Sequence, residues 1–541
     1  MISITTLKKH STFIIVGTII VLGILAYANA LPNKFLYDDN DGIVNNIYIK
    51  DWHYFPNYFS ENLTAGAGVV SNYWRPVLLI TYSIEWHLWK DWVPGYHAVN
   101  ILMHIADAIL IFFILFHLFS LQGPAAIAAL LFTIHPLQTE AITYISGLGD
   151  PLSLFFILVG TYFFLKVRGV LSSTKGNNLL LNYAIIVVVF LLALMTKERS
   201  VVFPAVLLLI DFFIWKTREL SILPFWNFIK LSFIRIAPFG AISLGYLMLR
   251  GTLLNFQNTF NIYTIPNYYT EHIAARIFTF LSIIPTYFSL IITPFGLHME
   301  RSNEIVIATT LFNPLVLLGT SILLTIGLLA IYALEKHPAY TFGVLWFLFM
   351  IFPSSGIAAP VAGIIYEHYL YAPLIGIALL IGLAGCALYN YVSNRAMQAL
   401  LIGTFLVTVV FLSVQTTLQN KVNWKDQKTF YINTLRYVPR SLQMRNNLGL
   451  LYASQGNFQK AEETYRLAIL YTPSSPLPHH NLGNLLYQTG RLDEAIKEYE
   501  KAITISPRSS LPYQALYHLY LDKNELTKAN EVMKQLQLLS E

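Results

Sequence analysis

Three carboxylates follow the first hydrophobic segment of the chain within one short stretch. Asp38, Asp39 and Asp41 come directly after an apolar run that ends near Leu31. Ionisable groups at a membrane boundary are costly to hold in place and usually mark chemistry or transport. A carboxylate there can act as a general base, removing a proton from an acceptor hydroxyl as it attacks an activated carbon. Asp38 and Asp39 are therefore the predicted catalytic residues; the alternative is a helix cap or a solvated loop acid.

Basic residues are predicted on the same side of the membrane. Arg75 follows Tyr73-Trp74, and Lys197 and Arg199 flank Glu198. Lysine and arginine in external loops run against the positive-inside bias, so they call for a reason. A phosphate leaving group supplies one, because arginine binds phosphate bidentately and lysine acts as a point charge. We predict that Arg75, Lys197 and Arg199 bind a donor phosphate; the alternative is that they pair with local acids such as Glu198.

Further polar residues on that side are candidates for contact with a substrate, with bundle packing or, for the last two, interfacial anchoring as the alternatives: His135, Glu140, Asp150, Glu367 and His368. The spacing around His135 does not match a zinc motif, because no second histidine falls at a metal-ligand offset on a helix. The single cysteine, Cys386, excludes a cysteine-based metal site and an intramolecular disulfide. We expect no metal and no cofactor, with a divalent ion held by carboxylates and histidine as the less favoured alternative.

The elements that position these residues are predicted to be membrane helices. The 541 residues are 55% hydrophobic and 12% charged, and apolar stretches long enough to cross a bilayer recur from residue 12 to about residue 416. Lys8 and Lys9 before the first span predict a cytoplasmic N-terminus. The long apolar core of that span, Phe13 to Leu31, and the acidic cluster directly after it predict a retained signal anchor. The net charge of +6 is modest and clusters in short loops, which indicates topology and not nucleic-acid binding. We predict an all-α fold with a polytopic membrane domain over residues 1–420.

The segment 273–294 leaves the topology open. It is apolar, but Pro285 divides it and Arg276 interrupts it. If it spans fully, the chain has 12 spans and its tail is cytoplasmic; if it is re-entrant or interfacial, the chain has about 11 spans and its tail is external. The second alternative also places Lys336 and Arg395 inside and Glu367 outside, so the positive-inside rule favours it.

The tail repeats with a period of 34 residues, the tetratricopeptide spacing. Asn447-Leu448-Gly449 recurs as Asn481-Leu482-Gly483, and Pro473 recurs as Pro507. We predict a short α-solenoid over residues 421–541, with repeats at about 440–473, 474–507 and 508–541 and a degenerate half-repeat at 421–439. Such arrays offer a concave groove for a protein acceptor or assembly partner. The alternative is that the repeats only scaffold or dimerise.

The order of these motifs resembles one known family. The chain is similar to the transmembrane and tetratricopeptide-repeat protein O-mannosyltransferases, a branch of the GT-C glycosyltransferases. The matching stretches are Tyr37-Asp38-Asp39 with Ile43-Val44-Asn45-Asn46, Trp74-Arg75-Pro76, Gly95-Tyr96-His97-Ala98-Val99-Asn100-Ile101-Leu102-Met103-His104, His135-Pro136-Leu137-Gln138-Thr139-Glu140, Gly147-Leu148-Gly149-Asp150, Thr196-Lys197-Glu198 and Glu367-His368-Tyr369-Leu370-Tyr371.

The resemblance implies transfer of a sugar, mannose or another hexose, from a polyprenyl-phosphate donor to Ser or Thr of proteins. The reaction would invert the anomeric centre, with Asp38 or Asp39 as the base. The polyprenyl-phosphate sugar would be a co-substrate, and both the active site and the repeats would face the periplasm or lumen. His368 replaces the family's arginine, so a phosphate contact there would depend on pH or be lost. The low cysteine content and the short repeats are typical of a bacterial member.

Two other functions stay open. The acceptor would be a lipid or a cell-wall glycan if the repeats only organise a complex. A non-enzymatic membrane scaffold is the third alternative, although a scaffold does not need an acidic cluster with external arginine and lysine. A transporter fits the long external loops and the terminal repeats less well.

Overall fold

The computed structural model describes residues 4–171, 178–219, 222–256, 267–361 and 363–539, and these residues form helices and no strand. The chain divides into two compact units, Met1–Lys425 and Asp426–Glu541. The predicted all-α fold class, a bundle of apolar helices followed by helical repeats, is confirmed. The predicted domain and repeat boundaries stay predictions.

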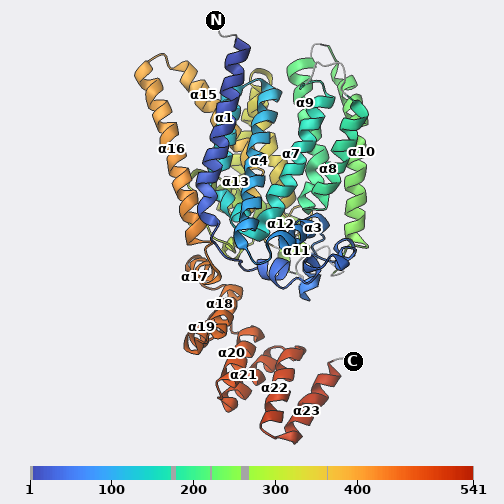
Figure 1. The fold of residues 1–541 in the computed structure, drawn as a ribbon, viewed down its shortest axis with the longest axis vertical. Coiled ribbons are helices and arrows are strands. Elements are labelled where there is room, and N and C mark those ends of the chain that lie inside the picture. Colours follow the sequence, from blue (N-terminus) through green and yellow to red (C-terminus); the bar gives the residue numbers. More distant parts are fainter. Residues whose placement is uncertain (1–3, 172–177, 220–221, 257–266, 362, 540–541) are drawn as a thin grey trace. The chain divides into compact units, whose positions relative to one another are not determined.

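The first unit is a bundle of long helices with short helices at one end (Figure 1). Its helices are α1 (Ile4–Tyr27), α2 (Asn57–Ser60), α3 (Pro76–Trp89), α4 (Val93–Phe119), α5 (Gln122–Ile134), α6 (Thr139–Ile142), α7 (Gly149–Val167), α8 (Leu179–Leu194), α9 (Phe203–Ile214), α10 (Phe225–Gly251), α11 (Tyr268–Glu271), α12 (Ile273–Ile292), α13 (Pro314–Lys336), α14 (Pro338–Ile351), α15 (Leu374–Tyr391) and α16 (Arg395–Val422).

Nine helices of the described residues are long and apolar enough to cross a membrane, or ten if the bent pair around His135 counts as one span. The shorter apolar helices α8 and α14 add to them. Length and composition therefore show a multi-pass membrane protein.

The two ends of the bundle can be told apart by contacts. At the end where α1 begins, Ser11 Oγ lies 3.3 Å from Gln122 Oε1 at the start of α5. Residues at the C-terminal ends of α4, α9 and α13 meet at the same end around one pocket. We call this end the N-terminal face. The opposite end carries residues 31–92, 135–148, 196–200, 352–361 and 363–373, and we call it the site face.

Helix α12 begins and ends on the site face. Before it, Asn72 donates from Nδ2 to Asn255 Oδ1 at 3.4 Å, and the Tyr269 hydroxyl lies against Gly356. After it, His135 Nε2 donates to the carbonyl oxygen of Ile291 at 2.9 Å.

A 20-residue helix is long enough to cross a bilayer, so length alone counts α12 as a span. Because both of its ends contact the same face, α12 instead lies along or re-enters that face. The structure therefore agrees with the 11-span alternative: α1, α4, α5, α7, α8, α9, α10, α13, α14, α15 and α16 alternate between the two faces.

Small residues let the bundle helices approach closely. A Cβ at Gly376 of α15 would lie 2.2 Å from the Gly343 carbonyl oxygen of α14, and one at Gly382 would lie 2.7 Å from the Pro124 carbonyl oxygen of α5. Close packing of small residues is a main source of helix association inside a membrane, where no hydrophobic force joins the helices. These glycines therefore hold α15 between α5 and α14.

The second unit consists of antiparallel helix pairs. Its helices are α17 (Gln427–Tyr437), α18 (Leu442–Ser454), α19 (Phe458–Tyr471), α20 (Pro476–Gln488), α21 (Leu492–Ile505), α22 (Ser510–Asp522) and α23 (Leu526–Leu538). A Cβ at Gly449 or Gly483 would lie 2.4 or 2.5 Å from the ring of Tyr465 or Tyr499, so glycine is required where the two helices of a repeat meet.

The position of α12 can be tested by labelling engineered cysteines in a Cys386→Ser background. Glu271→Cys and Thr309→Cys, which flank α12 at exposed positions, should react with a membrane-impermeant maleimide from the same side. Lys230→Cys at the N-terminal face is the control and should react only from the other side. Labelling of residues 271 and 309 from opposite sides would show that α12 crosses the membrane.

Candidate active site

Asp39 is fully buried and its carboxylate is held by three hydrogen bonds. Oδ2 accepts from the Leu36 N–H at 2.8 Å, and Oδ1 accepts from the N–H and the hydroxyl of Ser146 at 2.8 and 2.5 Å. Burial raises the pKa of Asp39 to about 7, while the three hydrogen bonds favour the ionised form. This carboxylate ties the segment after α1 to the turn Ile145–Leu148 that precedes α7.

Asp38 differs from its neighbour because its side chain is exposed to solvent. Its backbone N–H donates to the Tyr144 hydroxyl at 2.9 Å. Tyr37, directly before it, adopts a φ of 45°, a left-handed conformation that is uncommon outside glycine and that often occurs at functional sites. Although Asp38 reaches solvent, the protein packed around its carboxyl partly desolvates it and raises the pKa of Asp38 to about 6, with Asp41 adding to the rise and Tyr144 and Arg75 opposing it.

Arg75 precedes α3, which begins with Pro76 at a position that favours proline. Its guanidinium forms a bidentate pair with Glu198, with Nη2 at 2.9 Å from Oε2, and it stacks on the Tyr73 ring at 4.5 Å. Burial alone would lower the pKa of Arg75, but Glu198 outweighs it and the pKa is raised. For Arg75, the geometry therefore supports the alternative in which the cation pairs with a local acid, Glu198.

Lys197 and Arg199 share one carboxylate, Asp150, at the start of α7. Lys197 Nζ lies 2.6 Å from Asp150 Oδ1, and Arg199 Nη1 lies 3.8 Å from the same oxygen. Arg199 also lies over the Tyr369 ring at 4.0 Å from its centroid. The extended backbone at Lys197 and the short helix Glu198–Val202 turn the chain between α8 and α9, which brings these cations to the site face.

His368 connects Arg199 to a second buried carboxylate. Its Nδ1 lies 2.8 Å from Glu140 Oε1, and its backbone N–H donates to Glu140 Oε2 at 2.9 Å. Arg199 Nη2 lies 3.4 Å from Nε2, and because arginine only donates, Nε2 is the acceptor and Nδ1 carries the proton. Burial holds the pKa of His368 well below its usual value, so this histidine is neutral.

Glu367 and His135 support the site from behind. Glu367 Oε1 accepts from the His298 N–H at 2.8 Å and from Arg301 Nη2 at 3.1 Å, and it is 2% exposed. Both ring nitrogens of His135 are used, one by the Ile291 carbonyl and the other by the Leu137 N–H. These two residues therefore hold the segments around the pocket in place.

The predicted residues gather on one face. Tyr73 is close enough to Asp38 and Glu198, and to Arg75 and Arg199, to interact electrostatically with each of them. A narrow cavity on the same face is lined by Asp150, Lys197, Arg199 and His368 together with Tyr369 and Tyr371. Within the described ranges, no group of three histidine, cysteine, aspartate or glutamate side chains could hold a metal ion, and the expectation of no metal stays an expectation.

Sequence reasoning missed the residues that hold the acids in place. Tyr144, Ser146 and Arg301 contact Asp38, Asp39 and Glu367, respectively. Arg301 could have been found by the rule used for Arg75, because it is a cation in a loop that the 11-span alternative places outside. A serine and a tyrosine in a short turn give no such signal.

Two family models match the second unit. One, described as "Tetratricopeptide repeat", matches residues 476–509, and the other, "TPR repeat", matches residues 449–490. Most of the chain is also similar to curated proteins. A protein O-mannosyl-transferase of Caenorhabditis elegans is 25% identical over 458 residues, which cover 83% of this chain and 62% of the relative.

Most of the chain is thus similar to protein O-mannosyl-transferases. Others with this name include one from Mus musculus, 23% identical over 82% of this chain and 50% of its own length, and one from Homo sapiens, 23% identical over 84% of this chain and 65% of its own length. The chain thus spans between half and two thirds of these protein O-mannosyl-transferases. The resemblance to the family predicted from the motifs is confirmed.

The two aspartates should differ in their effect on stability. Asp39→Asn replaces one of the two carboxylate oxygens by an NH₂ group, which cannot accept a hydrogen bond from the donors that point at it. We expect this substitution to lower the free energy of unfolding by about 1–3 kcal/mol. Asp38→Asn leaves the backbone hydrogen bond to Tyr144 intact and should change stability by less than about 0.5 kcal/mol. Thermal unfolding of the purified variants in detergent measures both, and equal loss in the two variants would contradict the assignment.

Proposed function

We propose that the chain transfers a hexose from a polyprenyl-phosphate donor to Ser or Thr hydroxyls of proteins on the outer face of the membrane. The observation that carries the proposal is the difference between the two neighbouring aspartates. The Asp39 carboxylate is buried and accepts three hydrogen bonds, whereas Asp38 is exposed and near Arg75. The names of the relatives support a transferase acting on protein, and the helical repeats support a protein acceptor.

Asp38 is the proposed base and Asp39 the residue that positions it. The acceptor oxygen attacks the anomeric carbon, its proton passes to the Asp38 carboxylate, and the bond between that carbon and the phosphate oxygen breaks. The configuration inverts, and polyprenyl phosphate leaves. A base with a pKa near the working pH combines an ionised resting form with useful basicity, and Asp38 meets this condition.

Arg199 is the proposed first contact of the leaving phosphate. Arg75 and Lys197 are held at 2.9 and 2.6 Å by Glu198 and Asp150, whereas Arg199 lies 3.8 Å from its carboxylate. The cation that is farthest from its carboxylate loses the least interaction energy when a phosphate replaces that carboxylate as its partner. Arg75 and Lys197 add positive charge nearby, and neutral His368 lines the pocket with buried Glu140 behind it.

The compartment follows from the alternation of spans. The N-terminal face carries Lys216, Arg218, Lys230 and Arg395, which the positive-inside rule assigns to the cytoplasm. The site face then lies outside, in the periplasm or lumen. Since the second unit follows α16 directly, we propose that the repeats are in the same compartment as the site and recruit the acceptor.

Replacement of Asp38 should abolish transfer without unfolding the chain. In cells that lack the gene, wild type should restore a hexose-sized mass on specific external proteins, measured on the intact proteins, and Asp38→Asn should not. Asp41→Asn is the matched control, since it removes a neighbouring carboxylate of the same loop, and it should restore the mass. If only a glycolipid changes, the acceptor is a lipid or glycan; if Asp38→Asn complements fully, the chain is a scaffold.

Transfer should also depend on pH through Asp38. Its pKa is raised from the ordinary value of 3.8 to about 6, so the base is protonated below that pH and the rate should fall about tenfold per unit there. In Asp41→Asn the midpoint should move to lower pH, because Asp41 raises the pKa of Asp38. Initial rates of the purified chain between pH 4.5 and pH 8, roughly the span around this pKa, measure both. A flat profile would remove Asp38 as the base.

A further inference from the structure

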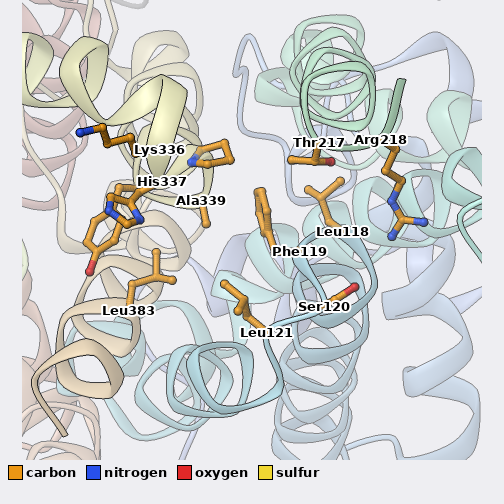
Figure 2. Close-up of a pocket in the computed structure, with 12 residues that line it drawn as sticks. Leu118, Phe119, Ser120, Leu121, Thr217, Arg218, Lys336, His337, Ala339 and Leu383 are labelled. Carbon is orange, nitrogen blue, oxygen red and sulfur yellow. The ribbon is translucent and has the colours of Figure 1, made fainter. Parts of the chain in front are cut away.

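A separate pocket opens at the N-terminal face, on the opposite side of the bundle from the aspartates. It encloses about 520 Å³, within the range of small-molecule sites, and lies where α4, α9, α13, α14 and α15 meet. Its floor and walls are apolar, with Leu118, Phe119, Leu121 and Leu383 among them (Figure 2).

Basic side chains stand on two sides of this pocket. Lys336 and His337 lie on one wall and Arg218 on the other (Figure 2). The lining contains no aspartate or glutamate within the described residues. Three basic residues from two distant chain segments therefore line one cavity.

The acids near the pocket are already paired elsewhere. Glu335 binds Lys216 at 2.7 Å, Glu219 binds Arg168 at 2.9 Å, and Asp211 pairs with Arg168 and Arg235. No carboxylate of the described chain lies within ion-pair distance of Arg218 or Lys336. Arg218 Nη2 donates to the His117 carbonyl at 2.6 Å, which fixes the guanidinium without neutralising it. The pocket thus keeps a net positive charge.

The surface that leads away from the pocket is apolar and exposed. Leu121 at the rim is 40% exposed, and Ile331 and Tyr332 of α13 are 71% and 76% exposed. Tyr332 precedes Lys336 by four residues, so the two share a side of the helix. An occupant with a negative head and apolar chains would place its head among the cations and its chains along α13.

We propose that this pocket binds the phosphate headgroup of an anionic phospholipid from the leaflet at the N-terminal face. Arginine and lysine match a phosphate in charge and geometry, and basic pockets between membrane helices on the cytoplasmic side bind such headgroups. The lipid headgroup would add a link between the turn after α9 and the α13–α14 turn, beside the Lys216–Glu335 pair that already joins them. The inference is independent of the proposed transferase activity, because it uses the opposite face and none of its residues.

Native mass spectrometry of the full chain tests the proposal. The purified protein is offered phosphatidylglycerol and phosphatidylcholine with the same acyl chains, and it should retain phosphatidylglycerol preferentially. Arg218→Gln/Lys336→Gln should weaken that retention about thirtyfold, since each cation near a membrane surface strengthens such binding severalfold. Lys230→Gln/Arg395→Gln removes two exposed cations of the same face outside the pocket and should leave it unchanged.

Other outcomes would overturn the proposal. Equal loss in both double variants would mean that the face attracts anionic lipid without a site, and unchanged retention in the pocket variant would exclude the pocket. Displacement by polyprenyl phosphate at lower concentration than phosphatidylglycerol would assign the pocket to that lipid, and displacement by inorganic phosphate would reduce it to an anion site. If the neutral variant fails to fold, Arg218→Lys/Lys336→Arg keeps the charge and must keep the preference.

Discussion

The site depends on the pairing of buried charges that come from distant parts of the chain. Arg75 meets Glu198, Lys197 meets Asp150, and Arg301 meets Glu367. Removing one partner of a buried pair usually costs about 3–5 kcal/mol, because it leaves the other charge uncompensated. Each pair therefore fixes two segments relative to each other. The geometry around Asp38 is a consequence of these links as much as of the helices that carry them.

The path of α12 is what makes one of these pairs possible. Because α12 returns to the face where it began, the segment after it delivers His298 and Arg301 to Glu367. Had α12 crossed, this segment would start on the other face and Glu367 would be buried without its cation. Helix α3, also at the site face, similarly begins at Arg75. Two helices that do not cross thus bring two of the cations to the site.

Hydropathy, periodicity and loop positions were enough to predict the helical bundle, the repeats and a shared face of the bundle for Asp38, Arg75, Lys197 and His368. These signals come from length, spacing and loop charge, which the sequence states directly. They could not separate Asp38 from Asp39, because burial depends on Ser146, more than a hundred residues away. Nor could they assign Arg75 to Glu198 instead of a phosphate, since both partners are anions and only distance decides. The 11- and 12-span alternatives stayed open because hydropathy shows that a segment is apolar and long enough to cross. It does not show on which face of the bundle the two ends of that segment lie.

The contrast between Arg75 and Arg199 has a consequence for catalysis. Interactions accelerate a reaction only where they are stronger in the transition state than in the ground state. A guanidinium held bidentately, as Arg75 is by Glu198, has little to gain from a developing phosphate charge. Arg199, 3.8 Å from Asp150 and stacked on Tyr369, is oriented but only weakly neutralised, so a negative charge that grows beside it is stabilised as it forms. In the proposed transfer, the tight pairs would hold the site in shape, and the loosely paired Arg199 would respond to the leaving phosphate.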